Sequence, residues 1–434
     1  SADESSAPVP VVTDVPAQSA TLRTTGSEGL AIAADLPYAV SIPEPALSVP
    51  AGESRQVVFT AVSPAGVVIE KRYTFRGDRY DFDLQQRLIN SGTATARGVL
   101  GLALVEPWDE SKEGSRFEFA GPITLSTDKL HESKVKDLAK EPADFSKEIA
   151  WTALVSKYFV GAAAPRPEAV AKVRVEKAPG VLVSSILAPA RSLAPGESVN
   201  YDYLLYFGPR DIEALRTAGA QLDRLVDYGF FGIIAVPLLH VLKFFYTFVG
   251  NYGAAIILLT VIIKLLFWPL TQKSYSSMKA MQKLQPEMQR LREKHKNDRD
   301  RLNREIMELY RDNRVNPLGG CLPMLVQIPV FFALYKVLLI SIELRQAPFA
   351  LWITDLSLKD PYYVTPLIMG ATMFIQQKMT PTSMDPMQAK VFLIMPVVFT
   401  FLFLNFPSGL VIYWLVNNVL TISQQYFINR KTSA

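Results

Sequence analysis

The sequence predicts an all-β domain followed by an α-helical membrane bundle of five transmembrane helices with a hydrophilic helical hairpin. Residues 21–222 contain short apolar runs with a period of two, separated by turn residues, as in β-sandwiches. From residue 229 onward the apolar runs lengthen and the charges collect between them, as in proteins that cross a membrane several times. The net charge of +4 is small, so the positions of the positive charges are more informative than their sum.

The first 20 residues are rich in Ser, Ala, Pro and Val, and we expect them to form a flexible linker. They show no signal-peptide pattern, so we expect that an upstream segment was removed. Cys321 is the one cysteine, which excludes an intramolecular disulfide. The β domain is large enough to bury a core without disulfides, so an extracytoplasmic location remains possible.

Strands in residues 21–222 are predicted from alternation and from turns. Apolar runs at 57–62 and 67–69 flank a Ser-Pro-Ala-Gly turn, and residues 80–85 alternate apolar and polar side chains. Further apolar runs lie at 99–105, 181–187 and 201–207. Residues 145–160 also fit a helix. The domain shows no metal-ligand spacing and no nucleophile–base pair, which favours a structural or docking role.

Five apolar segments are candidates to cross a bilayer, which requires about 20 mostly apolar residues. They are residues 253–270, 321–342, 362–380, 391–405 and 408–428. The fourth is short, so we expect it to tilt little or to thin the bilayer locally. Pro323, Pro329, Pro366 and Pro396 lie within these segments, which requires that protein or trapped water satisfies the carbonyls they leave free.

Residues 223–250 contain a sixth apolar run, 229–249, that has two interpretations. As a span, it would form a tight hairpin with the next segment and place the β domain on the same side as the basic loop that follows. As an amphipathic helix in the membrane interface, it would leave the two on opposite sides. The charge distribution favours the interfacial helix.

The loop at residues 271–316 carries twelve basic residues against seven acidic ones. An excess of Lys and Arg in a short loop marks the cytoplasmic side. Counting spans from this loop places the β domain and residues 343–360 outside. Residues 381–390 and the C-terminus then lie inside.

Apolar residues recur every three or four positions in both halves of this loop. They are Met278, Met281, Leu284, Met288 and Leu291 in the first half, and Leu302, Ile306 and Leu309 in the second. The pattern predicts two antiparallel helices that pair through these faces. The methionines and basic groups are also suited to contact apolar partners, acidic lipid headgroups or ribosomal RNA, and this alternative stays open.

Lys264 is the candidate functional residue, because a lysine near the bilayer centre costs about 2.5–3.5 kcal/mol. No Asp or Glu lies within the five segments to pair with it. Snorkelling is the alternative, although the loop entrance at Thr271 is about 10 Å away along a helix. We expect a water-containing groove around Lys264. Its predicted lining is Thr260, Gln327, Gln376, Gln377, Tyr413, Trp414 and Asn417, with Asn418, Gln424 and Gln425 as further candidates.

Several classes of protein are disfavoured. The sequence has no Gly-x-x-x-x-Gly-Lys nucleotide loop and no His-Glu-x-x-His metal site. Acidic residues, the usual proton relays of pumps, are missing from the spans. We therefore expect no enzyme activity, no cofactor and no metal. A small-anion transporter remains an alternative, as does a protease that pairs Lys264 with Ser408 or Ser423.

Four stretches resemble the signature sequences of YidC-type membrane protein insertases. They are residues 316–323 (NPLGGCLP), 343–353 (ELRQAPFALWI), 360–363 (DPYY) and 406–414 (FPSGLVIYW). The likeness is dense over residues 223–430 and looser over the β domain. It implies a multispan protein of the bacterial inner membrane that inserts other membrane proteins and acts as their chaperone, alone or with the Sec translocon.

The resemblance also implies an architecture and partners. It implies a periplasmic β-supersandwich, a mobile cytoplasmic hairpin, and a groove open to cytoplasm and lipid but closed to the outside. Nascent membrane proteins would be the substrates. The Sec translocon with its accessory subunits would be a partner, and the hairpin and C-terminal tail would contact a ribosome or targeting receptor. Family members usually carry arginine at the position of Lys264. Lysine keeps the positive charge but lacks the planar guanidinium group, which can bind an anion at two points. They also usually begin with a membrane anchor, which we expect upstream of residue 1.

Overall fold

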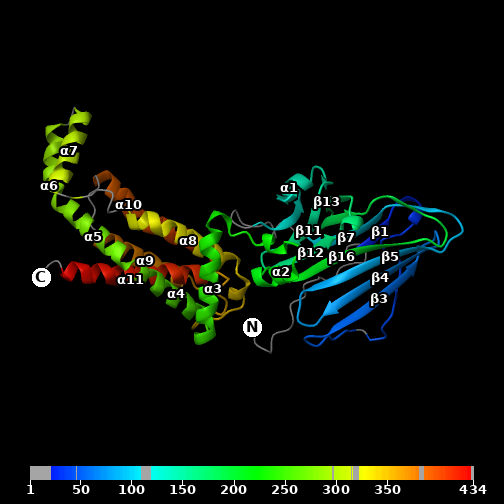
Figure 1. The fold of residues 1–434 in the computed structure, drawn as a ribbon. Coiled ribbons are helices and arrows are strands. Elements are labelled where there is room, and N and C mark those ends of the chain that lie inside the picture. The colour runs from blue at the N-terminus through cyan, green and yellow to red at the C-terminus, as the bar shows by residue number, and fades with distance from the viewer. Residues whose placement is uncertain are drawn as a thin grey trace. The chain divides into compact units, whose positions relative to one another are not determined.

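The computed structural model describes residues 21–44, 46–108, 119–295, 298–313, 315, 322–380 and 386–431. The chain divides into two compact units, residues 5–227 and residues 228–434 (Figure 1). The expected linker at residues 1–20 and most of the signature stretch 316–323 lie outside the described residues.

The first unit is a β domain, and the strands of its described part pair antiparallel. One sheet has nine strands in the order β2 (Ala39–Val40), β3 (Ser54–Val62), β4 (Val67–Arg76), β5 (Asp81–Asn90), β16 (Ser198–Pro209), β12 (Phe159–Pro165), β11 (Ile149–Val155), β8 (Gly121–Ser126) and β9 (Lys129–Glu132). A second sheet has five strands in the order β1 (Arg23–Gly26), β7 (Leu100–Pro107), β14 (Val181–Leu187), β13 (Lys172–Ala178) and β10 (Ala143–Phe145). A short pair, β15 (Arg191–Leu193) and β6 (Ala96–Gly98), and two short helices, α1 (Val135–Leu138) and α2 (Ile212–Ala218), complete it.

The two large sheets bury one apolar core. Leu84 of β5 and Leu205 of β16 come from the nine-stranded sheet, and Leu102 of β7 and Val175 of β13 come from the five-stranded sheet. Alternate side chains of a strand point to opposite faces, so each strand contributes every second residue to this core. The prediction of an all-β domain is confirmed.

Local predictions in the β domain had two outcomes. The Ser-Pro-Ala-Gly turn joins β3 to β4, and Gly66 N donates to Ser63 O at 2.9 Å. The helical alternative for residues 145–160 is wrong, because they contribute to strands β10, β11 and β12. Most of β11 is buried on both faces, which removes the alternation that would have identified it as a strand.

Strand β4 carries a lysine, Lys71, at an inward-facing position where the alternation of the strand predicts an apolar residue. Val67, Ile69, Lys71 and Tyr73 all point inward. Lys71 is 7% exposed, and its Nζ donates to Leu22 O at 3.3 Å. Burial lowers the pKa of Lys71 to about 8. A buried charge of this kind destabilises a folded domain unless a partner compensates it.

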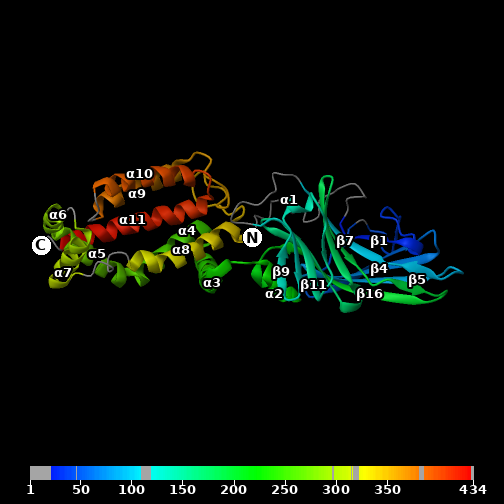
Figure 2. The same cartoon turned by 90° about the horizontal axis from the view of Figure 1, so that it is seen from above.

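The second unit is helical. Its described helices are α3 (Gly232–Val249), α4 (Tyr252–Leu266), α5 (Trp268–Lys283), α6 (Gln285–Lys294), α7 (Arg299–Asp312), α8 (Leu322–Ile340), α9 (Val364–Met379), α10 (Pro386–Phe403) and α11 (Ser408–Lys431). Helix α11 packs against α9 on one side and α4 on the other, and Figure 2 shows it in the middle of the unit. Helix α3 packs against α4 and α8, and Figure 1 shows it crossing one end of the bundle while α6 and α7 lie at the other end.

The helices differ in how well they suit a bilayer. Among the described helices, Gly229–Val249 is long and apolar enough to cross one, and the pair Tyr252–Leu266 and Trp268–Lys283, bent by 60°, would count as a second span. Leu325–Ile340 and Leu393–Phe403 are apolar but shorter. Five spans and an interfacial position for residues 229–249 therefore stay predictions.

Helices α6 and α7 pair through their apolar faces, as the spacing of apolar residues predicts. Leu284, Met288 and Tyr310 form a buried cluster, and the Tyr310 hydroxyl donates to Met288 Sδ at 3.2 Å. His295 Nε2 lies 2.9 Å from Glu305 Oε2 near the turn of the hairpin. Met288 is thus packed inside the hairpin, and its side chain forms no outer contact surface.

Replacing Lys71 with Met should stabilise the β domain at neutral pH, because Met fills similar volume without a buried charge. The folded-state pKa of Lys71 lies below the unfolded value of 10.5, so the parent domain gains stability as pH rises from 8 to 10.5. The advantage of the Met variant is therefore largest below pH 8, up to about 3 kcal/mol, and disappears above the unfolded pKa. Burial raises the pKa of Tyr38 to about 12 and that of Tyr73 further, so these neighbours stay neutral over this range.

The measurement is urea unfolding of a fragment spanning residues 21–227 at pH 7 and pH 10, followed by the fluorescence of Trp108 and Trp151. A Met variant less stable than the parent at pH 7 would contradict the expectation.

Candidate functional site

Lys264 lies near the end of α4, and its side chain reaches across to α11. It is 9% exposed. Its Nζ donates to Thr421 Oγ1 at 2.6 Å and to Asn417 Oδ1 at 3.2 Å. Asn417 and Thr421 are one helical turn apart, so both oxygens face the same side of α11. The ammonium is thus held by two neutral oxygens.

Gln327 of α8 joins this group, because its Nε2 donates to the same Asn417 Oδ1 at 3.3 Å. We call Lys264, Gln327, Asn417 and Thr421 the Lys264 cluster. Lys264 and Thr421 are buried, whereas Gln327 and Asn417 are half-buried. The cluster therefore joins three helices, and its Gln327 side is partly exposed at the surface of the helical unit.

The cluster lies well away from both ends of α11. Thr421 follows Ser408, the first residue of the helix, by about 20 Å and precedes Lys431, the last, by about 15 Å, at 1.5 Å per residue. The hydrocarbon core of a bilayer is about 30 Å thick. If α11 crosses it over the predicted span 408–428, Thr421 lies about 10 Å from the nearer end of that span, the same distance as that from Lys264 to the loop entrance along α4.

A second polar group lies further along α11. Gln425 Nε2 donates to Tyr275 OH on α5 at 2.6 Å and to Thr380 Oγ1 at 2.9 Å. Gln424 is fully buried, and within the described part of the chain neither polar atom of its side chain has a hydrogen-bond partner. Polar side chains thus continue from the Lys264 cluster toward the end of the bundle that carries α5.

Three of the predicted groove residues meet in the Lys264 cluster: Lys264, Gln327 and Asn417. Thr260 is buried one turn before Lys264 and donates to Ile256 O of its own helix at 2.7 Å. Gln376 and Gln377 lie on α9, which contributes no residue to the cluster.

Tyr413 and Trp414 lie in an aromatic cluster instead. The ring of Trp414 is 4.7 Å from that of Phe331 and 5.2 Å from that of Phe403. Tyr413 is buried, with its ring 6.5 Å from Phe331. These rings fill the bundle between the Lys264 cluster and the start of α11.

Two residues of this region were not predicted from the sequence. Thr421 makes the shorter of the two hydrogen bonds to Lys264. The one feature of the sequence that could have identified it is its position four residues after Asn417, on the same face of the helix. Lys336 is a further lysine of the predicted spans, in 321–342, and it is half-buried. It lies one turn before Ile340, the last residue of α8, so its ammonium can reach the interface along the helix.

The described signature stretches meet at the end of the bundle where α11 begins. The Ser408 hydroxyl and amide donate to Leu358 O at 2.8 and 2.7 Å. Asp360 accepts from Thr365 N at 2.8 Å and from Trp352 Nε1 at 3.0 Å, which fixes the loop before α9. These bonds tie the loop between α8 and α9 to the start of α11.

Neither candidate serine pairs with Lys264. The Ser408 hydroxyl donates to Leu358 O, and the Ser423 hydroxyl donates to Val419 O at 2.9 Å. The geometry therefore gives no support to a serine–lysine protease.

Apolar side chains on the outside of the helical unit are widely exposed. They include Ile262, Leu265 and Leu266 on α4, Leu325 and Ile328 on α8, and Val397 and Phe401 on α10. Exposed apolar surface of this extent is typical of contact with a membrane or a protein partner.

Comparison with known proteins identifies similar sequences over nearly the whole chain. Residues 3–241 match the family described as YidC periplasmic domain, and residues 244–434 match the family described as 60Kd inner membrane protein. A protein of Geobacter metallireducens named membrane protein insertase YidC is 56% identical over 390 residues, 89% of this chain and 73% of that protein. Proteins of the same name are 56% identical over 389 residues in Geobacter sulfurreducens (89% of this chain and 73% of that protein) and 52% identical over 383 residues in Geotalea daltonii (88% and 72%).

A cysteine placed at Gln327 should react with a membrane-impermeant maleimide, because the reactive thiolate forms where water reaches it. Each cysteine is introduced into a Cys321→Ser variant, which has no other cysteine, and the protein is studied in lipid vesicles. A cysteine at Leu265, which is 60% exposed on the outside of α4, should stay unlabelled because hydrocarbon covers it. A cysteine at Leu259, packed at 2% exposure, is the buried control. Equal labelling at Gln327 and Leu265 would contradict a water-accessible cluster.

Proposed function

The chain belongs to the YidC family of membrane protein insertases, and we propose that its Lys264 cluster draws the extracytoplasmic tail of a substrate protein into the membrane. The observation that carries this proposal is the ammonium of Lys264, which is buried and bonded to two neutral oxygens. Its positive charge is not neutralised by a carboxylate in the described residues. An acidic tail would supply the missing negative charge.

Burial makes this charge effective. Two unit charges 4 Å apart attract by about 1 kcal/mol in bulk water and by about 4 kcal/mol at an effective dielectric constant of about 20. A tail that reaches the half-buried side of the cluster at Gln327 and Asn417 therefore gains attraction that an exposed lysine would not provide. The step requires no covalent bond and no nucleotide.

The apolar helix of the substrate then moves into lipid, driven by removal of its apolar surface from water. We propose that it leaves along α8 and α10, corresponding to the predicted spans 321–342 and 391–405. Exposed apolar residues on both helices, such as Leu325 and Phe401, support this route.

We propose five spans, formed by α4, α8, α9, α10 and α11, with the β domain and residues 343–360 in the periplasm. Residues 271–316, 381–390 and the C-terminus then lie in the cytoplasm. The opposite positions of α3 and the α6–α7 hairpin at the two ends of the bundle support this orientation (Figure 1).

Helix α3 is proposed to lie in the outer interface. It crosses the end of the bundle rather than running alongside it (Figure 1). Phe230, Ile233 and Phe248 are exposed on or next to it, as expected for a face turned toward acyl chains. Lys243 Nζ lies 2.5 Å from Glu343 Oε1, which ties α3 to the loop that follows α8.

Partners at the cytoplasmic end are proposed from the charge of the hairpin. Its apolar residues Leu284 and Met288 are buried between α6 and α7. Contact with a ribosome, a targeting receptor or acidic lipid would therefore use exposed basic residues such as Lys294 and Arg301. Cooperation with the Sec translocon is proposed from family membership alone. A small-anion transporter is not favoured, because the similar proteins are insertases.

The test is insertion of a single-span substrate with an acidic tail into vesicles that contain the purified protein. Lys264→Glu should reduce the insertion rate at least tenfold, because it replaces attraction by repulsion, and a barrier change of about 1.4 kcal/mol is sufficient for that factor. Lys264→Ala should give an intermediate loss, and Lys264→Arg should retain most of the activity.

Two controls separate the electrostatic role from damage to the fold. Lys336→Glu makes the same charge change at a lysine outside the cluster and should leave insertion nearly unchanged. A substrate whose tail acids are replaced by Asn and Gln should lose most of its sensitivity to Lys264→Glu. If Lys264→Glu inserts the acidic substrate normally, or impairs both substrates equally, the electrostatic role is wrong.

A further inference from the structure

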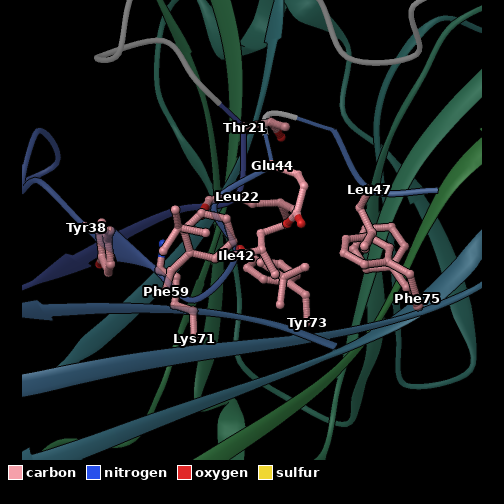
Figure 3. A pocket seen from close by; sticks show the side chains of 13 residues that line it. Thr21, Leu22, Tyr38, Ile42, Glu44, Leu47, Phe59, Lys71, Tyr73 and Phe75 are labelled. Atoms are coloured by element: carbon pink, nitrogen blue, oxygen red, sulfur yellow. The ribbon is translucent and has the colours of Figure 1, made fainter. Parts of the chain in front are cut away.

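The β domain contains a cavity of about 710 Å³ (Figure 3). Its walls come from strands β2, β3, β4 and β5, from Thr21 and Leu22 just before β1, and from residues next to β2 such as Tyr38 and Ile42. Leu22, Tyr38, Ile42, Phe59, Lys71 and Phe75 are among the residues that line it. Ligand cavities in proteins usually measure about 300–1,000 Å³, so one small ligand fits.

One wall of the cavity is a continuous row of aromatic rings. The ring centres of Phe59 and Tyr73 are 5.7 Å apart, those of Tyr73 and Phe75 are 6.0 Å apart, and those of Phe75 and Phe82 are 4.8 Å apart. All four point from the inner face of the nine-stranded sheet. This wall can bury a long apolar group but offers it few hydrogen bonds.

The polar group of this wall is Lys71, which stands in line with the buried residues of β4. Its Nζ donates to Leu22 O at 3.3 Å and lies 4.6 Å from the centre of the Tyr38 ring. Within the described part of the chain no carboxylate lies within 4 Å of it. Buried charges in proteins are normally paired, so the cavity presents a positive charge that lacks an anion.

These observations discriminate between classes of ligand. An extended peptide or a sugar would leave backbone amides or hydroxyls against the aromatic row without hydrogen-bond partners, which is unfavourable in a buried site. A neutral hydrocarbon would leave Lys71 uncompensated. The ligand that satisfies both features has an apolar chain and one anionic head.

We propose that this cavity binds a monoanionic amphiphile, a single alkyl or aryl chain that ends in a carboxylate. The carboxylate contacts Lys71, and the chain lies on the rings of Phe59, Tyr73 and Phe75 (Figure 3). Glu44 also borders the cavity and is exposed, so a head with two negative charges is repelled more strongly than a carboxylate. This site is separate from the Lys264 cluster and does not depend on the insertase mechanism.

The experiment uses the full chain in lipid nanodiscs and decanoic acid that carries a photoactivatable diazirine and an alkyne. After irradiation, the modified peptides are identified by mass spectrometry. Adducts should form on peptides that contain the cavity residues, and decanoate should compete for them better than decanol or decyl phosphate. Adducts on the helical unit report non-specific partitioning from lipid in the same sample.

Lys71→Met should lower the yield of cavity adducts at least about tenfold at low probe concentration, because a hydrogen bond to a charged group is lost. Lys157→Met is the matched control, since Lys157 Nζ also lies over a tyrosine ring, 5.0 Å from the centre of Tyr158, outside the cavity. Ile42→Trp fills the cavity from its half-buried covering segment and should block labelling while Lys71 is intact.

Several outcomes would overturn the proposal. These are adducts confined to the helical unit, equal competition by decanoate and decanol, and unchanged cavity labelling in both Lys71→Met and Ile42→Trp. An apolar peptide that competes as well as decanoate would also overturn it, because the cavity would then accept a backbone.

Discussion

A lysine ammonium held between helices by neutral oxygens is the constraint on which the helical unit depends. Removing an ammonium from water costs several kcal/mol even after the protein relaxes around it. Hydrogen bonds to a charged group each return about 1.5–3 kcal/mol, so the bonds to Asn417 and Thr421 offset much of this cost. They do so only while α4 and α11 are in contact, so the two bonds favour the packing of these helices against each other.

The choice of neutral partners has a functional consequence. A carboxylate in place of Asn417 would stabilise Lys264 more strongly, but it would also cancel the field of the ammonium inside the protein. With an amide and a hydroxyl the field persists, and it extends toward the half-buried side at Gln327. At the other end of α11, Ser408 is bonded to Leu358 and aromatic rings pack around Trp414. The polar interior is thus asymmetric along α11, which suits a protein that receives a polar segment from one side only.

The sequence predicted the classes of structure better than the contacts. Strand β5 was identifiable from its alternation, and β14 and β16 were identifiable as apolar runs next to turn residues. The doubly buried β11 lacked alternation and also fitted a helix. Lys264 was identifiable because a charge within an apolar run is costly. Its partners were harder to select, because ten polar or aromatic residues of the spans were compatible with a groove and helical phase alone does not fix which of them face one another. Gln327 and Asn417 meet Lys264, but Gln376 and Gln377 lie on α9, and Thr421 was overlooked because a lone threonine in a helix usually bonds its own backbone.

Lys71 and Lys264 show why the same residue type was visible in one unit and hidden in the other. In an apolar helix a charge far from the ends breaks the pattern, so Lys264 was evident without knowledge of the fold. In a strand, polar residues are expected at every second position, and Lys71 is exceptional only because Val67, Ile69 and Tyr73 on the same face are buried. Lys71 is also less well satisfied, with one backbone carbonyl and one aromatic ring where Lys264 has two side-chain oxygens. A buried cation whose own fold supplies so little compensation is best explained by a partner that arrives from outside, and the apolar walls around it restrict what that partner is.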